Sequence, residues 1–280
     1  MNEINEQPRK RFLVLDTSTA SQNVAVMQEN EVLVAENSYA DRNHSVGLVN
    51  GIQKLMEQSN TSRSKLAGIA VGVGPGSYTG IRIAVTTAKT LAWTLQIPVV
   101  GFSSLAALAW SGYREYLSTH IESSELSQTT ASSQPSVWII PLMDGRRAQV
   151  YTSLFDIQST STESTAETVT LPKRIEEDRI MLMDHWMDQI AAQYQGLSEQ
   201  ERPHHILIVG ETANHQERAE RLQDVIEAKI TILACGLDAG CAGEVGASLL
   251  LDGKYDDTHH LLPNYTQLSE AEANLLRQSK

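Results

Sequence analysis

Hydrophobic residues in the first 110 positions follow two kinds of pattern. Three short apolar runs, separated by turn-like polar residues, are typical of an antiparallel meander of three strands. Apolar residues at three- and four-residue spacing then predict an amphipathic helix, and a strand, a helix, a strand and a short helix follow it. The expected elements lie at 12–16, 24–27, 32–35, 44–58, 66–73, 81–95, 97–100 and 104–110.

The second half of the chain gives a similar order of elements. A strand over 137–143 is joined by the turn signal Asp144–Arg147 to a strand over 148–155, which predicts a hairpin. Helix, strand, helix, strand and helix are then expected at 182–195, 206–209, 215–227, 230–233 and 239–251. Strands that alternate with helices predict mixed sheets covered by helices, and the repeated order predicts an internally duplicated α/β protein of two lobes.

Polar segments set the expected domain boundaries. Two Ser/Thr-rich stretches without sustained periodicity, 118–136 and 158–170, are predicted to be polar loops of the second lobe. The tail after Leu262 is expected either to pack on the N-terminal lobe or to stay loose. The expected divisions are a polar tail over 1–11, an N-terminal lobe over 12–110, a C-terminal lobe over 111–262 and a C-terminal tail over 263–280.

Composition narrows the class of protein. The chain has 22 Lys and Arg against 34 Asp and Glu, a net charge of −12, so it is not expected to bind an RNA phosphate backbone alone. Two cysteines exclude a disulfide scaffold, and no apolar run is long enough to span a membrane. The polar N-terminal residues do not resemble a secretory signal, and we therefore expect a cytoplasmic globular protein.

Glycines cluster between the strand over 66–73 and the helix that follows it. Gly74, Gly76 and Gly80 lie where backbone N–H groups and a helix dipole can hold an anion. The spacing is not that of a Walker A loop, because no Lys-Ser/Thr pair follows Gly80, and it is not that of a dinucleotide fingerprint. The alternative is a tight turn that packs helix and strand closely, with Thr79 as the N-cap. The residues favour this tight turn.

Two acids end apolar strands, one in each lobe. Asp16 and Asp144 occupy positions where α/β proteins place reactive carboxylates or metal ligands. An Asp at such a position also caps a turn by accepting bonds from backbone N–H groups, and both interpretations stay open. His44 begins a predicted helix, but Leu48 stands where a metal-binding helix would need its second His, so no metal site is expected.

Several motifs together resemble the TsaB (YeaZ) family. They are the segments Leu13–Thr19, His44–Ser45, Val71–Arg82, Ala88–Lys89 and Ser103–Leu105. The resemblance is strong over 12–110, looser at Asp144–Arg146 and Pro263–Tyr265, and absent from the two Ser/Thr-rich stretches. It implies an actin/hexokinase/Hsp70-like (ASKHA) fold of two lobes, each a mixed sheet flanked by helices.

The resemblance implies a partner rather than a catalyst. TsaB-like proteins bind the paralogous transferase TsaD, join an assembly with the ATPase TsaE and support threonylcarbamoyl transfer to adenosine 37 of tRNAs that read codons beginning with A. Nucleotide-binding fold relatives carry Asp-x-Gly-x-Thr after the first strand, whereas this chain has Asp16–Thr19 without that glycine, and Gly210–Glu211 replaces an adenosine-binding glycine pair.

These departures imply no catalytic residue, metal or cofactor of the chain's own. ATP or ADP bound at a subunit interface of the complex stays open as an alternative to a purely structural loop. The residues that would then help to shape the site are Asp16, Gly74, Gly76, Gly80 and Asp144. An independent ATPase, kinase or peptidase is the alternative function.

In the family, the helices after His44 and after Gly80 pack against the partner, and the same surface supports a homodimer when the partner is absent. The alternative for these residues is packing against the protein's own sheet. Shared use of one face would make the two assemblies compete, and tRNA is expected to contact this chain only indirectly. The expected interface residues are His44, Leu48, Ile52, Thr79, Arg82, Ala84, Ala88 and Trp93.

Overall fold

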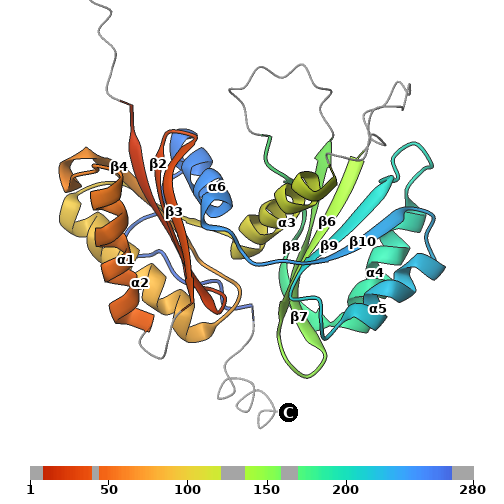
Figure 1. The fold of residues 1–280 in the computed structure, drawn as a ribbon. Helices are drawn as coiled ribbons and strands as arrows, with labels where there is room; N and C mark the ends of the chain where they lie inside the picture. Colours follow the sequence, from red (N-terminus) through yellow and green to blue (C-terminus); the bar gives the residue numbers. More distant parts are fainter. Residues whose placement is uncertain (1–8, 40–43, 121–135, 159–169, 267–280) are drawn as a thin grey trace, which may run out of the picture. The chain divides into compact units, whose positions relative to one another are not determined.

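The chain forms two compact units, each built on a five-stranded sheet (Figure 1). The computed structural model describes residues 9–39, 44–120, 136–158 and 170–266, without the side chains of 44–46 and His120. Most of each Ser/Thr-rich stretch, and the tails 1–8 and 267–280, lie outside these residues. Unit 1 draws on the segments Met1–Val73, Ser77–Phe102 and Asp238–Leu262, and unit 2 on Gly74–Gly76, Ser103–Leu237 and Pro263–Lys280.

The sheet of unit 1 has the strand order β3-β2-β1-β4-β5. The first three strands form the predicted antiparallel meander, while β4 runs parallel to β1 and β5 parallel to β4. The strands are β1 (Arg11–Asp16), β2 (Ser21–Gln28), β3 (Glu31–Tyr39), β4 (Leu66–Gly72) and β5 (Val99–Phe102). The helices are α1 (His44–Gln58), α2 (Tyr78–Leu95) and α6 (Ala239–Leu251), with a short 3-10 helix at Arg63–Lys65.

Side-chain alternation along β1 gives the sheet of unit 1 two packed faces. Leu13 and Leu15 belong to the buried core under α1 and α2. Val14 points to the opposite face, which α6 covers. A Cβ added to Gly246 of α6 would lie 2.5 Å from the Cβ of Ala70 and 3.2 Å from Val14 Cγ1, so the glycine allows the helix backbone to approach the sheet.

The sheet of unit 2 has the strand order β10-β9-β6-β7-β8. β6 and β7 form the predicted hairpin, and β9 and β10 run parallel to β6. The strands are β6 (Ser136–Asp144), β7 (Gln149–Gln158), β8 (Lys173–Leu182), β9 (His205–Gly210) and β10 (Lys229–Ala234). The helices are α3 (Ser104–His120), α4 (Met183–Gly196) and α5 (Gln216–Glu220), with a 3-10 helix at Arg221–Asp224.

The two sheets have one topology. In each, the first strand is central, pairs antiparallel with the second on one side and pairs parallel with the fourth on the other, and the third and fifth strands form the edges. The strands β1–β5 therefore correspond one by one to β6–β10. This correspondence confirms the predicted duplicated α/β architecture.

The helices α3 and α6 do not stay with the strands that precede them in sequence. α3 follows β5 but packs on β6 and β9, and α6 follows β10 but packs on the sheet of unit 1. The compact units therefore differ from the expected lobes 12–110 and 111–262. α3 also runs past its expected end at 110, because Tyr113 and Tyr116 continue its buried stripe.

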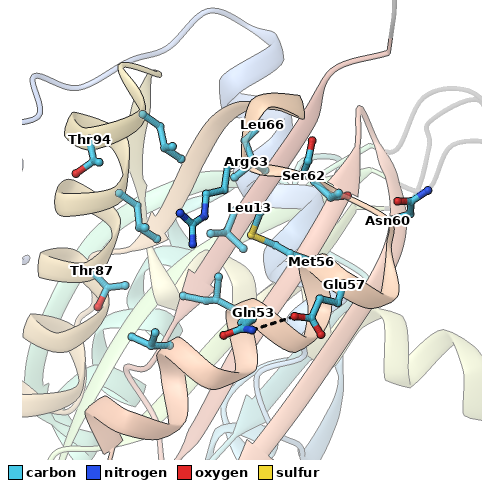
Figure 2. A pocket seen from close by; sticks show the side chains of 15 residues that line it. Leu13, Gln53, Met56, Glu57, Asn60, Ser62, Arg63, Leu66, Thr87 and Thr94 are labelled. Atoms are coloured by element: carbon cyan, nitrogen blue, oxygen red, sulfur yellow. Dashed lines mark hydrogen bonds between the residues drawn. The ribbon is translucent and has the colours of Figure 1, made fainter.

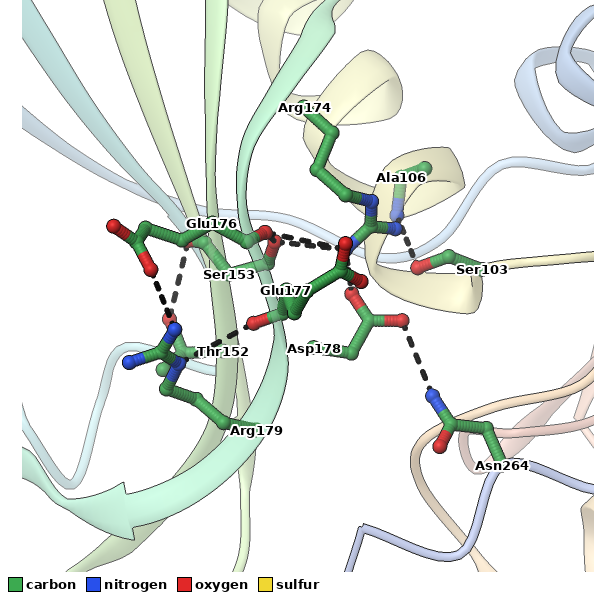
Figure 3. A network of polar contacts seen from close by, with 10 residues as sticks. All are labelled: Ser103, Ala106, Thr152, Ser153, Arg174, Glu176, Glu177, Asp178, Arg179 and Asn264. Atoms are coloured by element: carbon green, nitrogen blue, oxygen red, sulfur yellow. Dashed lines mark hydrogen bonds and ion pairs between the residues drawn. The ribbon is translucent and has the colours of Figure 1, made fainter.

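The sequence analysis did not predict β8. This edge strand is rich in charged residues, and its charges pair with one another beside β7 (Figure 3). Arg174 pairs with Asp178 and donates to Ser153 Oγ at 3.0 Å, while Arg179 pairs with Glu176. The interaction of these side chains, rather than an apolar run, stabilises the edge of the sheet.

The start of the C-terminal tail lies on unit 2. Asn264 Nδ2 donates to Asp178 Oδ2 at 3.4 Å (Figure 3), and the described tail residues group with unit 2. Neither expected arrangement, packing on the N-terminal lobe or staying loose, describes this first part of the tail. The helix expected over 215–227 is also shorter, because it divides into α5 and the 3-10 helix Arg221–Asp224.

Candidate functional site

The turn after β1 is closed by its own side chains. Asp16 is fully buried, and its Oδ1 accepts hydrogen bonds from the backbone N of Ser18 at 2.7 Å and from Ser18 Oγ at 2.6 Å. Ser18 is the third residue of the segment Asp16–Thr19, where the sequence analysis expects a glycine in a nucleotide-binding protein. The geometry is that of an Asp that caps a turn, one of the two interpretations open for this residue.

The N-terminus of α2 packs directly against that turn. Ser77 is the N-cap, because its backbone is not helical and its Oγ accepts from Gly80 N at 3.3 Å. The prediction of Thr79 as the cap was wrong, since Thr79 already lies within α2. Ser77 N donates to Ser18 O at 2.7 Å, and Thr17 Oγ1 donates to Gly80 O at 2.6 Å. The backbone N–H groups of Ser77 and Gly80 at this helix N-terminus are therefore already hydrogen-bonded within the protein.

The glycines of the loop serve this close packing. A Cβ on Gly80 would lie 1.9 Å from the carbonyl oxygen of Thr17. Gly74 and Gly76 have φ angles of 95° and 147°, a region that favours glycine. The local geometry thus supports the tight-turn interpretation of the loop.

In unit 2, Asp144 anchors the β6–β7 turn. Its Oδ1 accepts from Arg146 N at 2.9 Å and lies 3.4 Å from His215 Nε2, and its Oδ2 accepts from Asn214 Nδ2 at 3.2 Å. Burial raises the pKa of Asp144, but the hydrogen bonds from Arg146 N, Asn214 and His215 outweigh burial and hold this pKa below its ordinary value. Asp144, like Asp16, has the geometry of a turn-capping acid.

Glu211 ties the end of β9 to the same turn. Its Oε2 accepts from the backbone N of Asp144 at 2.7 Å, and its own N donates to Leu142 O at 2.8 Å. Gly210 has a φ of 107°, and a Cβ there would lie 2.3 Å from Leu142 O. Gly210 and Glu211 therefore join β9 to β6 and its turn.

The residues predicted for a partner interface divide into two groups. Leu48, Ile52, Ala84 and Ala88 are buried in the core of unit 1. Thr79, Arg82 and Trp93 are exposed on α2, with Trp93 at 59% of its full accessible area. His44 begins α1, but its side chain lies outside the described part of the chain.

A groove runs between α1 and α2 in unit 1 (Figure 2). Its volume is about 760 Å³, and apolar side chains of both helices and of β1 form much of its lining. Of the residues that line this groove, only Ile52 is among the interface residues expected from the sequence. The available signal was the wide apolar face of α1, which leaves Val49 56% exposed after Leu48 and Ile52 are buried. The apolar lining residues are Leu13, Val49, Ile52, Met56, Leu66, Leu91 and Leu95.

Among the described residues, no group of three or more His, Cys, Asp or Glu side chains is arranged to hold a metal ion. In the same part of the chain, no helix combines the length and hydrophobicity that crossing a membrane requires. The polar clusters at Asp16 and Asp144 bind their own backbone, whereas the groove between α1 and α2 is an open apolar surface.

Comparison with known proteins finds a matching family model and a relative that is similar over most of the chain. The family model described as TsaD, tRNA N6-adenosine threonylcarbamoyltransferase, matches residues 36–275. The chain is 32% identical over 270 residues to the tRNA threonylcarbamoyladenosine biosynthesis protein TsaB of Bacillus subtilis (strain 168), covering 96% of this chain and 99% of that protein.

Two solved structures from Pseudomonas aeruginosa are similar in fold. One is described as YeaZ, with a TM-score of 0.65 and 21% identity over 91% of this chain and 99% of that one. The other is described as an uncharacterized protein with similarity to peptidase YEAZ, with a TM-score of 0.65 and 20% identity over 92% of this chain and all of that one (100%).

Two sheets of identical strand order, each flanked by helices, form the two-lobed actin/hexokinase/Hsp70-like (ASKHA) fold that the sequence predicted. In this chain, the turn after the first strand is closed by Ser18. With the extent of the match to the Bacillus subtilis protein, the chain belongs to the TsaB (YeaZ) family.

Proposed function

We propose that this chain supports, rather than catalyses, the synthesis of threonylcarbamoyladenosine in tRNA. The relative from Bacillus subtilis is named for that pathway, and the matching family model is that of the transferase TsaD. The observation that carries the supporting role is the closed turn after β1, where Asp16 Oδ1 accepts two bonds from Ser18 and α2 packs on Thr17. A phosphate group has no open backbone cradle there.

The partner is a TsaD-like transferase that binds the α1–α2 face. These two helices offer a groove with an apolar lining, and α2 also exposes the ring of Trp93 outside that lining. Buried aromatic anchors dominate the energy of many interfaces. The residues available for contact are those that the core does not use, such as Thr79, Arg82 and Trp93. Leu48 and Ala88 lie in the buried core between these helices and the sheet.

The full proposal includes a larger assembly. A TsaE-like ATPase joins the complex, the product is threonylcarbamoylated adenosine 37 of tRNAs that read codons beginning with A, and tRNA contacts this chain only indirectly. The chain has no cofactor of its own, and ATP or ADP binds, if at all, where subunits meet. Without the transferase, two copies associate through the α1–α2 face and compete with the partner by mass action.

Reconstitution tests this proposal. The purified chain alone is expected to transfer no threonylcarbamoyl group, and to restore transfer when added to the transferase, the ATPase, tRNA, ATP and the threonylcarbamoyl donor. In a calorimetric titration, Trp93→Ala should weaken transferase binding about tenfold or more, whereas Tyr255→Ala, an equally exposed aromatic outside α1 and α2, should leave it unchanged.

Three results would overturn the supporting role. The first is the absence of any complex between the wild-type chain and the transferase. The second is tight Mg-ATP binding or turnover by the chain alone that Asp16→Ala abolishes, since the chain would then be an ATPase or kinase in its own right. The third is peptide hydrolysis by the chain alone, which would point to a peptidase.

A further inference from the structure

Arg63 points into the groove between α1 and α2. Figure 2 shows its guanidinium extending from the 3-10 helix Arg63–Lys65 toward Leu13, above the apolar lining. Within the described part of the chain, the Arg63 side chain makes no hydrogen bond or ion pair. It is a charged group at the edge of an apolar surface, with only water to solvate it.

Neighbouring cations have used the acceptors at this end of the groove. Arg11 Nη1 donates to Ser59 O and Asn60 O at 3.0 Å each and to Thr61 Oγ1 at 2.7 Å. Lys65 Nζ donates to Asn60 O at 3.1 Å. The nearby chain therefore fixes its other cations and leaves the guanidinium of Arg63 available.

The one carboxylate that lines the groove is already engaged on its own helix. Glu57 Oε1 accepts from Gln53 Nε2 at 2.9 Å, and no ion pair joins Glu57 to Arg63 in the described structure (Figure 2). A protein that covers the groove must therefore bring its own acceptor. Burying an unpaired guanidinium is costly, whereas a carboxylate can accept two parallel bonds from it.

We propose that Arg63 recognises a carboxylate on an amphipathic helix of the transferase-like partner, whose apolar residues fill the groove between α1 and α2. The proposal rests on the function proposed above and names the chemistry of the partner's contact. An amphipathic helix suits the site, because a groove with an apolar floor and a polar rim accepts apolar side chains at helical spacing. The carboxylate then selects the partner.

The charges of α1 and α2 argue against a second copy of this chain as the source of the carboxylate that binds Arg63, although a copy can still cover the same helices. α2 carries no Asp or Glu, and its charged residues are Arg82 and Lys89. The acid of α1 is Glu57, which is bonded to Gln53. A copy that docked through these helices would bring three cations, Lys54, Arg82 and Lys89, and one carboxylate, which already accepts a bond from Gln53.

Calorimetric titration of the full chain with the transferase tests the proposal. Arg63→Gln should weaken binding by about thirtyfold or more, Arg63→Glu should weaken it further, and Arg63→Lys should fall between wild type and Arg63→Gln. Lys254→Gln, which removes an exposed cation away from the groove, should change affinity less than about twofold. The thermal midpoint of each variant should match wild type, because Arg63 is exposed and unpaired.

A partner-side substitution completes the experiment. Changing each helical Asp or Glu of the partner's interface to Lys in turn should identify one variant that restores binding to Arg63→Glu, which a double-mutant cycle would record as coupling. Wild-type binding with no loss in Arg63→Glu would overturn this inference and leave the proposed function standing. No wild-type binding would overturn both. Loss of self-association in Arg63→Glu with unchanged transferase binding would assign the groove to a second copy and overturn the inference.

Discussion

Gly80 occupies a position that no side chain can share. The carbonyl oxygen of Thr17 approaches to 1.9 Å from the place a Cβ would take, and this oxygen belongs to a turn whose Ser18 O also accepts a bond from Ser77 N. The glycine therefore sets how closely α2 can approach the end of β1. Its role follows from a contact between Thr17 and Gly80, which are 63 residues apart in the sequence. The spacing of the glycines alone does not reveal this contact, and it left an anion-binding loop as an alternative.

Gly80→Ala is expected to destabilise unit 1 by about 2 kcal/mol or more, because the obstructing atom is backbone and cannot rotate away. Urea denaturation measures the change. Gly51→Ala is the matched control, since no atom lies within 4 Å of a Cβ there and an alanine inside α1 should be neutral or stabilising by about 1 kcal/mol. Equal midpoints for Gly80→Ala and wild type would contradict the packing.

Asp144 should make stability depend on pH in the acid range. Its folded pKa is depressed, so the folded state binds its proton more weakly than the unfolded chain, and its contribution is present above the unfolded pKa of about 3.8 and lost as pH falls through the folded value. Asp144→Asn should therefore lose less stability than wild type between pH 6 and pH 3, measured as thermal midpoints. Parallel curves for the two proteins would refute this role.

At the scale of elements, the sequence predicted those that carry an apolar run or apolar residues at helical spacing. The bounds of α1 and α6 agree with the expected ranges 44–58 and 239–251, because apolar residues mark the buried stripe of each helix. β8 could not be found in this way. Its residues are exposed or only partly buried, and its arginines pair with acids along the same strand, so that it lacks an apolar pattern.

For a similar reason, the sequence could not sort the expected interface residues into buried and exposed ones. Spacing identified the apolar faces of α1 and α2, but it could not separate Leu48 and Ala88, which pack on the protein's own sheet, from Trp93, which does not. Arg63 carried no signal at all, because an arginine in a polar connection looks solvated until the groove beside it is known.

The ion pair of Arg174 and Asp178 should stabilise the β8 edge. Asp178 is only 6% exposed, and the Arg174 guanidinium also lies 4.9 Å from the ring centroid of Phe155 (Figure 3 shows the polar contacts). Arg174→Ala should cost about 2–4 kcal/mol by urea denaturation, since it leaves a nearly buried carboxylate with little compensation. Adding Asp178→Asn should recover part of the loss.

The surface pair of Arg221 and Glu217 provides the control for that experiment. These side chains are 64% and 85% exposed, so Arg221→Ala should change stability by less than about 0.5 kcal/mol. A similar effect of Arg174→Ala would mean that the β8 pair is no stronger than an ordinary surface contact.

At the scale of the whole molecule, the sheet is duplicated and the two copies exchange a helix. Two sheets share one strand order, yet each is completed by a helix that follows the last strand of the other: α6 follows β10 and covers the sheet of unit 1, and α3 follows β5 and covers that of unit 2. An apolar stripe shows that a helix covers a sheet but not which one. The expected lobe boundaries at 110 and 262 therefore followed chain order, whereas packing does not.

Hydrogen exchange can separate these two arrangements. Gly246→Ala places a methyl group 2.5 Å from the Cβ of Ala70, so it should loosen α6 together with β1 and β4, although β4 ends at Gly72, far earlier in the chain. Mass spectrometry should then show faster exchange in these three elements and unchanged exchange in β6 and β9. Faster exchange in α6 together with β6 and β9, with β1 and β4 unaffected, would instead place α6 with the strands that precede it. The close approach at Gly246 requires the first result, because a methyl group there displaces the helix from the sheet of unit 1.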